Sequence, residues 1–384
     1  MSAGPPRSEE PRHDRGFSFG DAAGHARPRQ RDGSALYLGS VLGAPYVAAI
    51  LVMRRRPVLF TDELDHYSQI ALFLRGDFRV LTYYLTTIPG YHAAVAAILW
   101  LCGATSLDAA RLANAGFGLA AAAGFHALRR QLWPGTETLA TAQFLVLPIL
   151  VPLFFIVYTD VLALALVVWA AWATWTQRRW LSAALLSALI CVRQNEVVWA
   201  GFLAMLAVWP AWTAGRWHAW RTILARGLPY LVPVAGFLAF WRWNGSISLS
   251  PRQSALHPDL SLHAGNLFFA VFVAGALLPL HVVAGLREFG AALRRRPWLL
   301  AVPILIFTAF WYGFHVDNPY NTVSPGYYVR NGLLLAADAD PAVRMAGGAG
   351  VAIAACGLAF TRLRPAWAAW LYPFAVVFLA ASWL

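Results

Sequence analysis

A hydrophilic segment near residue 60 concentrates acids that could act in catalysis. It reads FTDELDHYSQIALFLRGDF over residues 60–78, and one face of a helix there would carry Asp62, Asp65, His66 and Gln69. A carboxylate partly withdrawn from water at a membrane surface becomes a stronger proton acceptor, which suits a general base. The same acids could instead belong to a solvated loop helix that offsets the charge of residues 54–56.

Two further polar sites interrupt apolar sequence. Asp160 stands between charge-free runs in FFIVYTDVLALAL, where an acid usually faces a cavity or a partner. The residues Arg193, Gln194, Asn195 and Glu196 interrupt LLSALICVRQNEVVWAGFLAML in the same way, and snorkelling at a helix end accounts for one of them but hardly for all. Asp160 could equally mark a simple hairpin turn at the membrane surface.

Two later loops are also polar. Residues 244–266 carry His257 and His263, and residues 314–332 carry His315, Asp317, Asn318, Tyr328 and Arg330. A solvated loop is the simpler interpretation of both. The histidines and cysteines have no zinc-ligand spacing, and the chain has no phosphate loop, G-x-S-x-G elbow or dinucleotide fingerprint. The sequence therefore predicts no metal site and no soluble nucleotide chemistry.

The elements that must position these residues are membrane-spanning helices. The chain of 384 residues is 59% hydrophobic and 12% charged, and runs such as Val161–Trp175 contain no charge, which a large soluble core does not explain. We predict an all-α bundle of about ten to twelve spans, at 34–53, 88–103, 107–128, 137–157, 161–176, 181–192 with 197–210, 229–243, 265–284, 298–316, 341–360 and 366–383. Residues 1–33 are predicted to be a disordered tail, 34–384 one membrane domain, and about 54–87 its first external loop.

Arginine clusters orient the predicted spans. All 30 basic residues are arginine, against 18 acids, and no nucleic-acid motif accompanies the net charge of +12, so the positive-inside bias explains it better than nucleic acid does. The clusters lie at 129–130, 178–179, 216–226, 294–296 and 362–364. If all face the cytoplasm, the turns near Asp160, 193–196, 244–264 and 317–340 face outward together. Residues 54–56 do not fit this orientation, and 88–128 fits only if one of its two spans is re-entrant or interfacial.

Five motifs, in order, resemble those of a known family. They are Asp62-Glu63 with His66, Gln69, Gly76-Asp77-Phe78 and Thr86-Thr87-Ile88-Pro89-Gly90; Pro152-Leu153-Phe154-Phe155 with Tyr158-Thr159-Asp160; Arg193-Gln194-Asn195 with Trp199; Asn244-Gly245-Ser246-Ile247; and Ser261-Leu262-His263. From about residue 60 to 331 the chain therefore resembles the dolichyl-phosphate-glucose α-1,2-glucosyltransferases, a family of membrane-embedded polyprenyl-phosphate-sugar transferases. It departs from that family at 250–254 and 317–320, which bears on the acceptor more than on the donor.

The resemblance implies a fold of the membrane-embedded glycosyltransferase C type. It also implies an inverting transfer of glucose from a polyprenyl (dolichyl) phosphate to a hydroxyl of a lipid-linked oligosaccharide or other glycan, in α-1,2 linkage. Asp62 or Glu63 would be the base, and Arg193 and Arg330 would bind the donor phosphate, since arginine can do so bidentately without a metal. The remaining substrate-binding residues would be His66, Gln69, Asp160, Gln194, Asn195, His263, Asp317, Asn318 and Tyr328. No cofactor is expected.

The expected partners are the polyprenyl-phosphate sugar donor, a glycan or glycolipid acceptor and membrane lipids, with no nucleic acid. The location would be the cytoplasmic membrane of a bacterium or the endoplasmic reticulum membrane of a eukaryote. Three alternatives stay open: a related transferase using another sugar such as mannose or aminoarabinose, a transporter or flippase of lipid-linked sugars, and a membrane scaffold. A transporter would show inverted symmetry between its halves, and the sequence shows none.

Overall fold

The structure is a computed structural model that describes residues 62–83, 85–135, 137–213, 220–250, 264–316 and 332–360. Every regular element in these ranges is a helix, so the all-α class predicted from the sequence is confirmed. The tail at 1–33 and the predicted spans at 34–53 and 366–383 lie outside the described residues.

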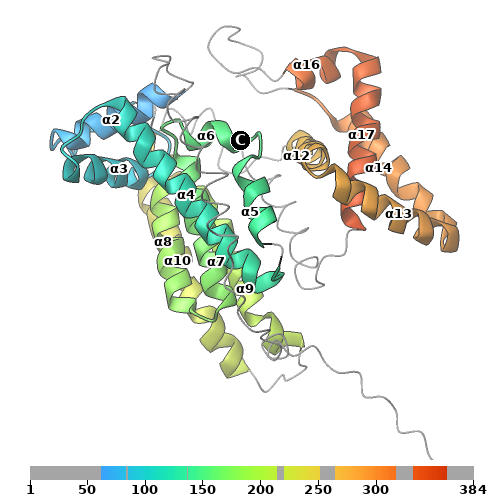
Figure 1. Cartoon of the computed structure of the whole chain (residues 1–384), viewed down its shortest axis with the longest axis horizontal. Helices are drawn as coiled ribbons and strands as arrows, with labels where there is room; N and C mark the ends of the chain where they lie inside the picture. Colours follow the sequence, from blue (N-terminus) through green and yellow to red (C-terminus); the bar gives the residue numbers. More distant parts are fainter. Residues whose placement is uncertain are drawn as a thin grey trace, which may run out of the picture.

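The helices form two groups, each with its own buried apolar core (Figure 1). The first group consists of α2 (Glu63–Leu74), α3 (Gly90–Leu101), α4 (Leu107–Leu132), α5 (Glu137–Leu145), α6 (Val151–Phe154), α7 (Thr159–Trp175), α8 (Arg179–Val192), η1 (Gln194–Val197), α9 (Val198–Thr213) and α10 (Trp220–Asn244). The second consists of α12 (Ala264–Leu277), α13 (Pro279–Arg295), η3 (Pro297–Leu300), α14 (Ala301–Gly313), α16 (Gly332–Ala339) and α17 (Pro341–Ala359). All the predicted site residues that the structure describes belong to the first group.

Helices α4 and α7 lie close together because small residues line both. Their buried alanines include Ala115, Ala121 and Ala122 on α4 and Ala163, Ala165 and Ala170 on α7. A Cβ on Gly124 would lie 2.9 Å from the indole Nε1 of Trp169, and that Nε1 donates a hydrogen bond to the carbonyl of Ala120 at 2.9 Å. Small side chains thus let the two helix backbones approach, as is typical of apolar helix bundles.

The first group has two chemically different ends. Ser106 caps the start of α4, and its side chain accepts a hydrogen bond from the Ala109 N–H. The last turn of α4 carries Arg129 and Arg130, whose positive charges interact favourably with the negative end of the helix dipole. The turn between α7 and α8 places Arg178 and Arg179 at the same end, near Arg226 of α10. These clusters therefore lie opposite the turns at Asp160 and 193–196, as the positive-inside interpretation predicts.

Only some of the predicted spans form helices of full spanning length. Among the described residues, α10 and α17 are long and apolar enough to cross a membrane. A third crossing is counted if residues 267–277 and 279–295 form one span with a bend of 102°. The shorter apolar helices lie at 90–101, 159–175, 179–192 and 297–313. The number of full-length helices in the described ranges is thus lower than the ten to twelve predicted spans.

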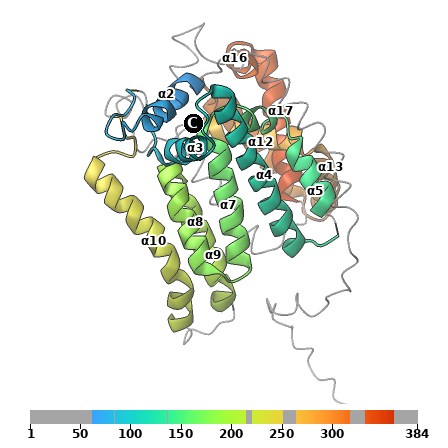
Figure 2. The same cartoon turned by 60° about the vertical axis from the view of Figure 1, so that its left-hand side comes forward.

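Breaks inside the apolar runs account for much of this difference. The predicted span at 137–157 contains Pro148 and Pro152 and forms the two short helices α5 and α6. The predicted span at 88–103 yields only the 12 residues of α3, about 18 Å of helix against a hydrocarbon core of about 30 Å. Figures 1 and 2 show α3 beside α2 at one end of the bundle. The short length of α3 therefore fits the alternative in which one of the two predicted spans at 88–128 is interfacial.

Candidate active site

The candidate site begins where α2 and α7 start. Asp62 directly precedes α2 and is exposed. The hydroxyl of Tyr158, the residue before α7, donates a hydrogen bond to the Asp62 Oδ2 at 3.2 Å. Asp160 lies in the first turn of α7, two residues further on. The start of α7 therefore brings two predicted acids, distant in sequence, to one place.

Glu63 has the opposite environment to Asp62. Its side chain is 0% exposed, and Arg111 of α4 holds it with two hydrogen bonds, Nε to Oε1 at 2.8 Å and Nη2 to Oε2 at 2.6 Å. The backbone N–H of Val157 donates to the same Oε1 at 2.9 Å. Both carboxylate oxygens are therefore engaged inside the protein. Glu63 joins α2 to α4 and to the loop before α7, and Asp62 is the acid of the pair that faces outward.

Two histidines pair behind Asp62. The Nδ1 of His66, one turn along α2, lies 2.9 Å from the Nε2 of His92 in the first turn of α3. The His66 ring meets the Tyr158 ring edge to face, with centroids 5.0 Å apart. His92 itself is fully buried. His66 thus lies between a buried imidazole and the tyrosine that bonds Asp62.

An ion pair closes the other side of the cluster. The Nη1 of Arg193, just after α8, lies 2.5 Å from the Oδ1 of Asp160, and its Nε lies 3.6 Å from the Oε1 of Glu196. The indole of Trp199 donates to the Glu196 Oε2 at 2.8 Å. Arg193 is largely buried, whereas the Asp160 side chain is one third exposed. Arg193 therefore turns inward onto the start of α7, and Glu196 contacts Arg193 and Trp199.

Two glutamines fasten the loops around the cluster. Gln69 bonds the loop after α2, donating to the Val80 carbonyl at 3.0 Å and accepting from the Thr82 N–H at 2.8 Å. Gln194 donates to the carbonyls of Thr86 and Ile247 at 2.8 and 2.6 Å and accepts from the Ile88 N–H at 3.1 Å. Both glutamines are buried, so their described contacts hold the backbone in place.

Burial and nearby charges set the protonation states. Burial lowers the pKa of His66 to about 4, although Asp62 and Asp160 act in the opposite direction. Burial also raises the pKa of Tyr158, and the same two acids raise it further while Arg193 lowers it. At neutral pH the site therefore holds a neutral imidazole and a protonated phenol beside Asp62, Asp160 and Arg193.

The structure thus brings Asp62, His66, Asp160 and Arg193 together around Tyr158. Gln69, Gln194 and Glu63 lie beside them in contacts with the protein, and the side chain of Asn195 makes no hydrogen bond within the described ranges. Five predicted substrate-binding residues fall outside those ranges: His263, Asp317, Asn318, Tyr328 and Arg330. Within them, no group of three His, Cys, Asp or Glu side chains is arranged to hold a metal ion.

The sequence motifs did not assign a role to Arg111, His92 or Tyr158. Arg111 and His92 lie inside the predicted spans 107–128 and 88–103, and a polar residue within a span is costly unless it has a partner. That signal could have marked both residues, although the partner of each, Glu63 or His66, becomes apparent only in the fold. Tyr158 carried no such signal because tyrosine is common at the ends of membrane helices.

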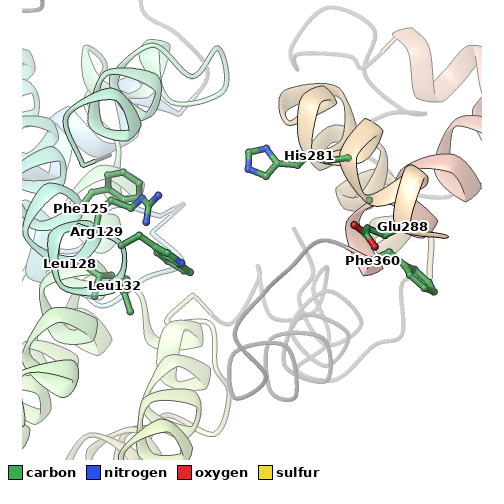
Figure 3. Close-up of a pocket in the computed structure, with 10 residues that line it drawn as sticks. Phe125, Leu128, Arg129, Leu132, His281, Glu288 and Phe360 are labelled. Carbon is green, nitrogen blue, oxygen red and sulfur yellow. The ribbon is translucent and has the colours of Figure 1, made fainter. Parts of the chain in front are cut away.

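A cavity of about 580 Å³ lies away from this site, at the arginine end of the first group (Figure 3). It is lined by the C-terminal half of α4, including Phe125, Arg129 and Trp133, and by residues 281–288 of α13. Along α4, Arg129 is 18 residues from Arg111, about 27 Å. The cavity is therefore separate from the acids and the ion pair.

Comparisons with known proteins point to one family. Residues 56–217 match the DIE2/ALG10 family, and this range contains every predicted site residue that the structure describes. The chain is 27% identical over 252 residues to a Drosophila melanogaster protein named Dol-P-Glc:Glc(2)Man(9)GlcNAc(2)-PP-Dol alpha-1,2-glucosyltransferase, and the alignment covers 56% of this chain and 55% of the relative. The chain thus spans about half the length of that relative. No solved structure matches the chain.

Proposed function

We propose, from the match of residues 56–217 to the DIE2/ALG10 family, that this protein is an integral-membrane glucosyltransferase. Its donor is a polyprenyl (dolichyl) phosphate glucose, and its acceptor is a hydroxyl of a lipid-linked oligosaccharide or another glycan. The linkage formed is α-1,2, made with inversion. The observation that carries the proposal is that the exposed Asp62 carboxylate, its Tyr158 partner and the Asp160–Arg193 pair form one cluster inside the matched range.

The reaction needs two protein groups at one membrane surface: a base for the acceptor proton and a group that binds the donor phosphate. The acceptor oxygen attacks the anomeric carbon of glucose from the face opposite the phosphate, and the bond from that carbon to the phosphate oxygen breaks with its electron pair. The acceptor proton passes to a base, and the polyprenyl phosphate leaves as an anion. Inversion to an α linkage requires that the donor sugar be β-linked.

Asp62 is the base in this proposal because its carboxylate is exposed and Glu63 is enclosed. The Tyr158 hydroxyl bonds only Oδ2, so it can fix the carboxylate while Oδ1 accepts the acceptor proton. Asp65 lies on the same helix and is a matched comparison, since its side chain makes no hydrogen bond in the described ranges.

Arg193 is the proposed contact of the donor phosphate. Its guanidinium is oriented by Asp160 and Glu196, which limits the freedom lost when a phosphate binds. Asp160, with a side chain one third exposed, is placed to accept a hydrogen bond from a sugar hydroxyl. The polyprenyl chain lies in the membrane, which explains why the site is built at the ends of apolar helices.

The test of this function is transfer by the full-length protein in lipid vesicles. The protein is supplied with labelled polyprenyl-phosphate glucose and a glycan that ends in glucose, and the product is analysed by mass spectrometry and by its sensitivity to an α-glucosidase. One added hexose in α linkage is expected. Transfer from polyprenyl-phosphate mannose but not from the glucose donor would shift the proposal to the other sugar. Movement of the donor across the vesicle membrane without transfer would favour the transporter.

Asp62→Asn is expected to reduce turnover by roughly 100-fold or more, with the KM for the donor little changed, because it keeps the size of the side chain and removes the proton acceptor. Asp65→Asn is the matched control and should stay near the wild-type rate. Initial rates against donor concentration measure both, and the thermal midpoint in detergent reports folding. A folded Asp62→Asn protein with normal turnover would rule out Asp62 as the base.

A further inference from the structure

The histidine pair behind Asp62 has an unequal set of hydrogen-bond partners. His66 Nδ1 and His92 Nε2 are 2.9 Å apart, so one of these atoms carries the proton and the other accepts it. His92 is 0% exposed, and its other ring nitrogen, Nδ1, has no hydrogen-bond partner within the described residues. The question is therefore which nitrogen of His92 carries its single proton.

Burial decides between the two tautomers of His92. A proton on Nδ1 would bury a donor without an acceptor, and it would also leave two lone pairs facing each other across the 2.9 Å contact unless His66 donated. A proton on Nε2 satisfies the contact and leaves only an acceptor unpaired, which is the more tolerated deficit. His92 also lies in the first turn of α3, where the positive end of the helix disfavours a doubly protonated imidazole.

We infer that His92 donates its Nε2–H to the Nδ1 of His66 and thereby fixes His66 as the tautomer that carries its proton on Nε2. The Nε2 of His66 makes no hydrogen bond with any described residue. That N–H is then a donor, on the same helix face as Asp62 and beside Tyr158, for an oxygen of the bound substrate. His66 is a substrate-binding donor in this arrangement, and His92 is a positioning residue that acts through it.

The inference rests on the proposed function, which supplies the two oxygens that such a donor could meet. One is a phosphate oxygen of the polyprenyl-phosphate sugar, and the other is a hydroxyl oxygen of a sugar. Both accept hydrogen bonds, and a neutral N–H donor serves either. The inferred tautomer also excludes His66 from the role of base, because the lone pair of its Nδ1 accepts the hydrogen bond from His92.

Amide substitutions distinguish the two nitrogens of each ring. The amide nitrogen of glutamine occupies nearly the place of a histidine Nε2, and that of asparagine nearly the place of Nδ1. His92→Gln should therefore keep the donor to His66, and His92→Asn should lose it. At position 66, His66→Gln keeps the outward donor and His66→Asn does not. We expect each glutamine variant to turn over at least about tenfold faster than its asparagine counterpart, the effect of about one hydrogen bond.

The kinetic constants identify the oxygen that His66 meets. A rise in the KM for the donor in His66→Asn assigns the contact to the phosphate sugar, and a rise in the KM for the acceptor glycan assigns it to an acceptor hydroxyl. Equal losses in the glutamine and asparagine variants, or faster asparagine variants, would overturn the assignment. The wild-type protein is assayed in parallel, so that failure of the proposed function can be told from failure of this inference. An inactive wild type counts against the proposed function alone.

A spectroscopic measurement keeps the inference testable without activity. The full-length protein, labelled with ¹⁵N-histidine and reconstituted in lipid vesicles, gives separate nitrogen shifts for protonated and unprotonated ring nitrogens. Comparison with His66→Gln and His92→Gln assigns the two rings among the 10 histidines of the chain. The expected result is a proton on Nε2 of both rings at neutral pH. A proton on Nδ1 of His66 would overturn the inference.

Discussion

At the scale of single residues, Asp62 and Glu63 are adjacent acids with opposite surroundings at the start of one helix. Neighbouring residues on a helix point about 100° apart, so only one of two adjacent acids can face the core. Glu63 faces it and receives three hydrogen bonds from Arg111 and Val157. Asp62 faces out and receives one from Tyr158. The buried acid thereby fixes the position of the exposed one.

Loss of Arg111 is expected to destabilise the protein rather than to change its chemistry directly. Arg111→Met removes the ion pair that Arg111 makes with the buried Glu63 side chain, which costs about 3–5 kcal/mol. The double variant Glu63→Gln with Arg111→Met should recover much of that loss, because no buried charge remains. Thermal unfolding in detergent measures both, with the exposed Arg79→Met as the control. An Arg111→Met protein as stable as the wild type would show that the pair does not anchor α2.

The pH dependence of stability should carry a contribution from His66. Burial holds the pKa of His66 at about 4 in the folded protein, against about 6.5 in the unfolded chain. Between these values the unfolded state binds more protons, so the contribution is full above pH 6.5 and is lost as the pH falls toward 4. It amounts to about 3 kcal/mol.

His66→Gln removes this group and should flatten the fall in stability from pH 6.5 to 4. Thermal midpoints of the wild type and His66→Gln across this range measure the effect as a difference, in which the other titrating groups largely cancel. Asp62, Asp160 and Arg193 act on His66 and are present in both proteins. Parallel curves would mean that His66 does not resist protonation in the folded state.

At the scale of elements, the site depends on loops that Gln194 holds together. Its side chain bonds residues 86–88 before α3 and residue 247 after α10, and the Leu249 N–H donates to the Thr86 carbonyl at 2.9 Å. The first helix position of α3 is close to the same place, since a Cβ on Gly90 would lie 2.4 Å from the Cys191 carbonyl oxygen. Gln194 therefore fastens α3, and with it His92, to the end of α8.

Gln194→Ala is expected to loosen these loops while leaving the bundle folded. Backbone hydrogen exchange should speed up by about tenfold or more in residues 82–90 and 245–250, because three hydrogen bonds of the order of 1 kcal/mol each are lost. Asn195→Ala is the matched control, since the Asn195 side chain makes no hydrogen bond in the described ranges. Exchange measured by mass spectrometry in detergent compares the two. Unchanged exchange in both loops would assign Gln194 to the substrate instead.

Apolar runs predicted some elements well, because in those cases one apolar run forms one helix. The predicted spans 107–128 and 161–176 correspond to α4 and α7 with ends shifted by a few residues. Other features could not be predicted, because they depend on partners far along the chain. Hydropathy alone does not predict how α3 is oriented in the bundle. The Glu63–Arg111 and Gln194–Ile247 contacts join residues that are 48 and 53 positions apart in the sequence. The motifs predicted the residues of the candidate site, and the contacts show which of those residues bond to the protein itself.

At the scale of the whole molecule, one end of the first group carries arginines and the other carries the site. Arg129, Arg178 and Arg179 lie at one end, and Asp62, Asp160 and Arg193 lie at the other. Clusters of positive charge near membrane spans are retained on the cytoplasmic side. If Arg193 binds the donor phosphate, as proposed, this orientation predicts that the donor presents its headgroup on the non-cytoplasmic face.

This orientation predicts the sides of the membrane from which two introduced cysteines react. In a background in which Cys102, Cys191 and Cys356 are replaced by alanine, Asp77→Cys lies in the loop after α2 and Arg178→Cys lies in the turn between α7 and α8. Both positions are exposed. A membrane-impermeant maleimide should label Asp77→Cys from the non-cytoplasmic side of intact cells or sealed vesicles. It should label Arg178→Cys only after permeabilisation, because the positive-inside rule keeps the arginine end in the cytoplasm.

Glucosyl transfer by the cysteine-free parent shows that the background is folded. Labelling of both cysteines from one side would contradict the two-ended arrangement, and labelling with the sides exchanged would place the transfer reaction on the cytoplasmic face.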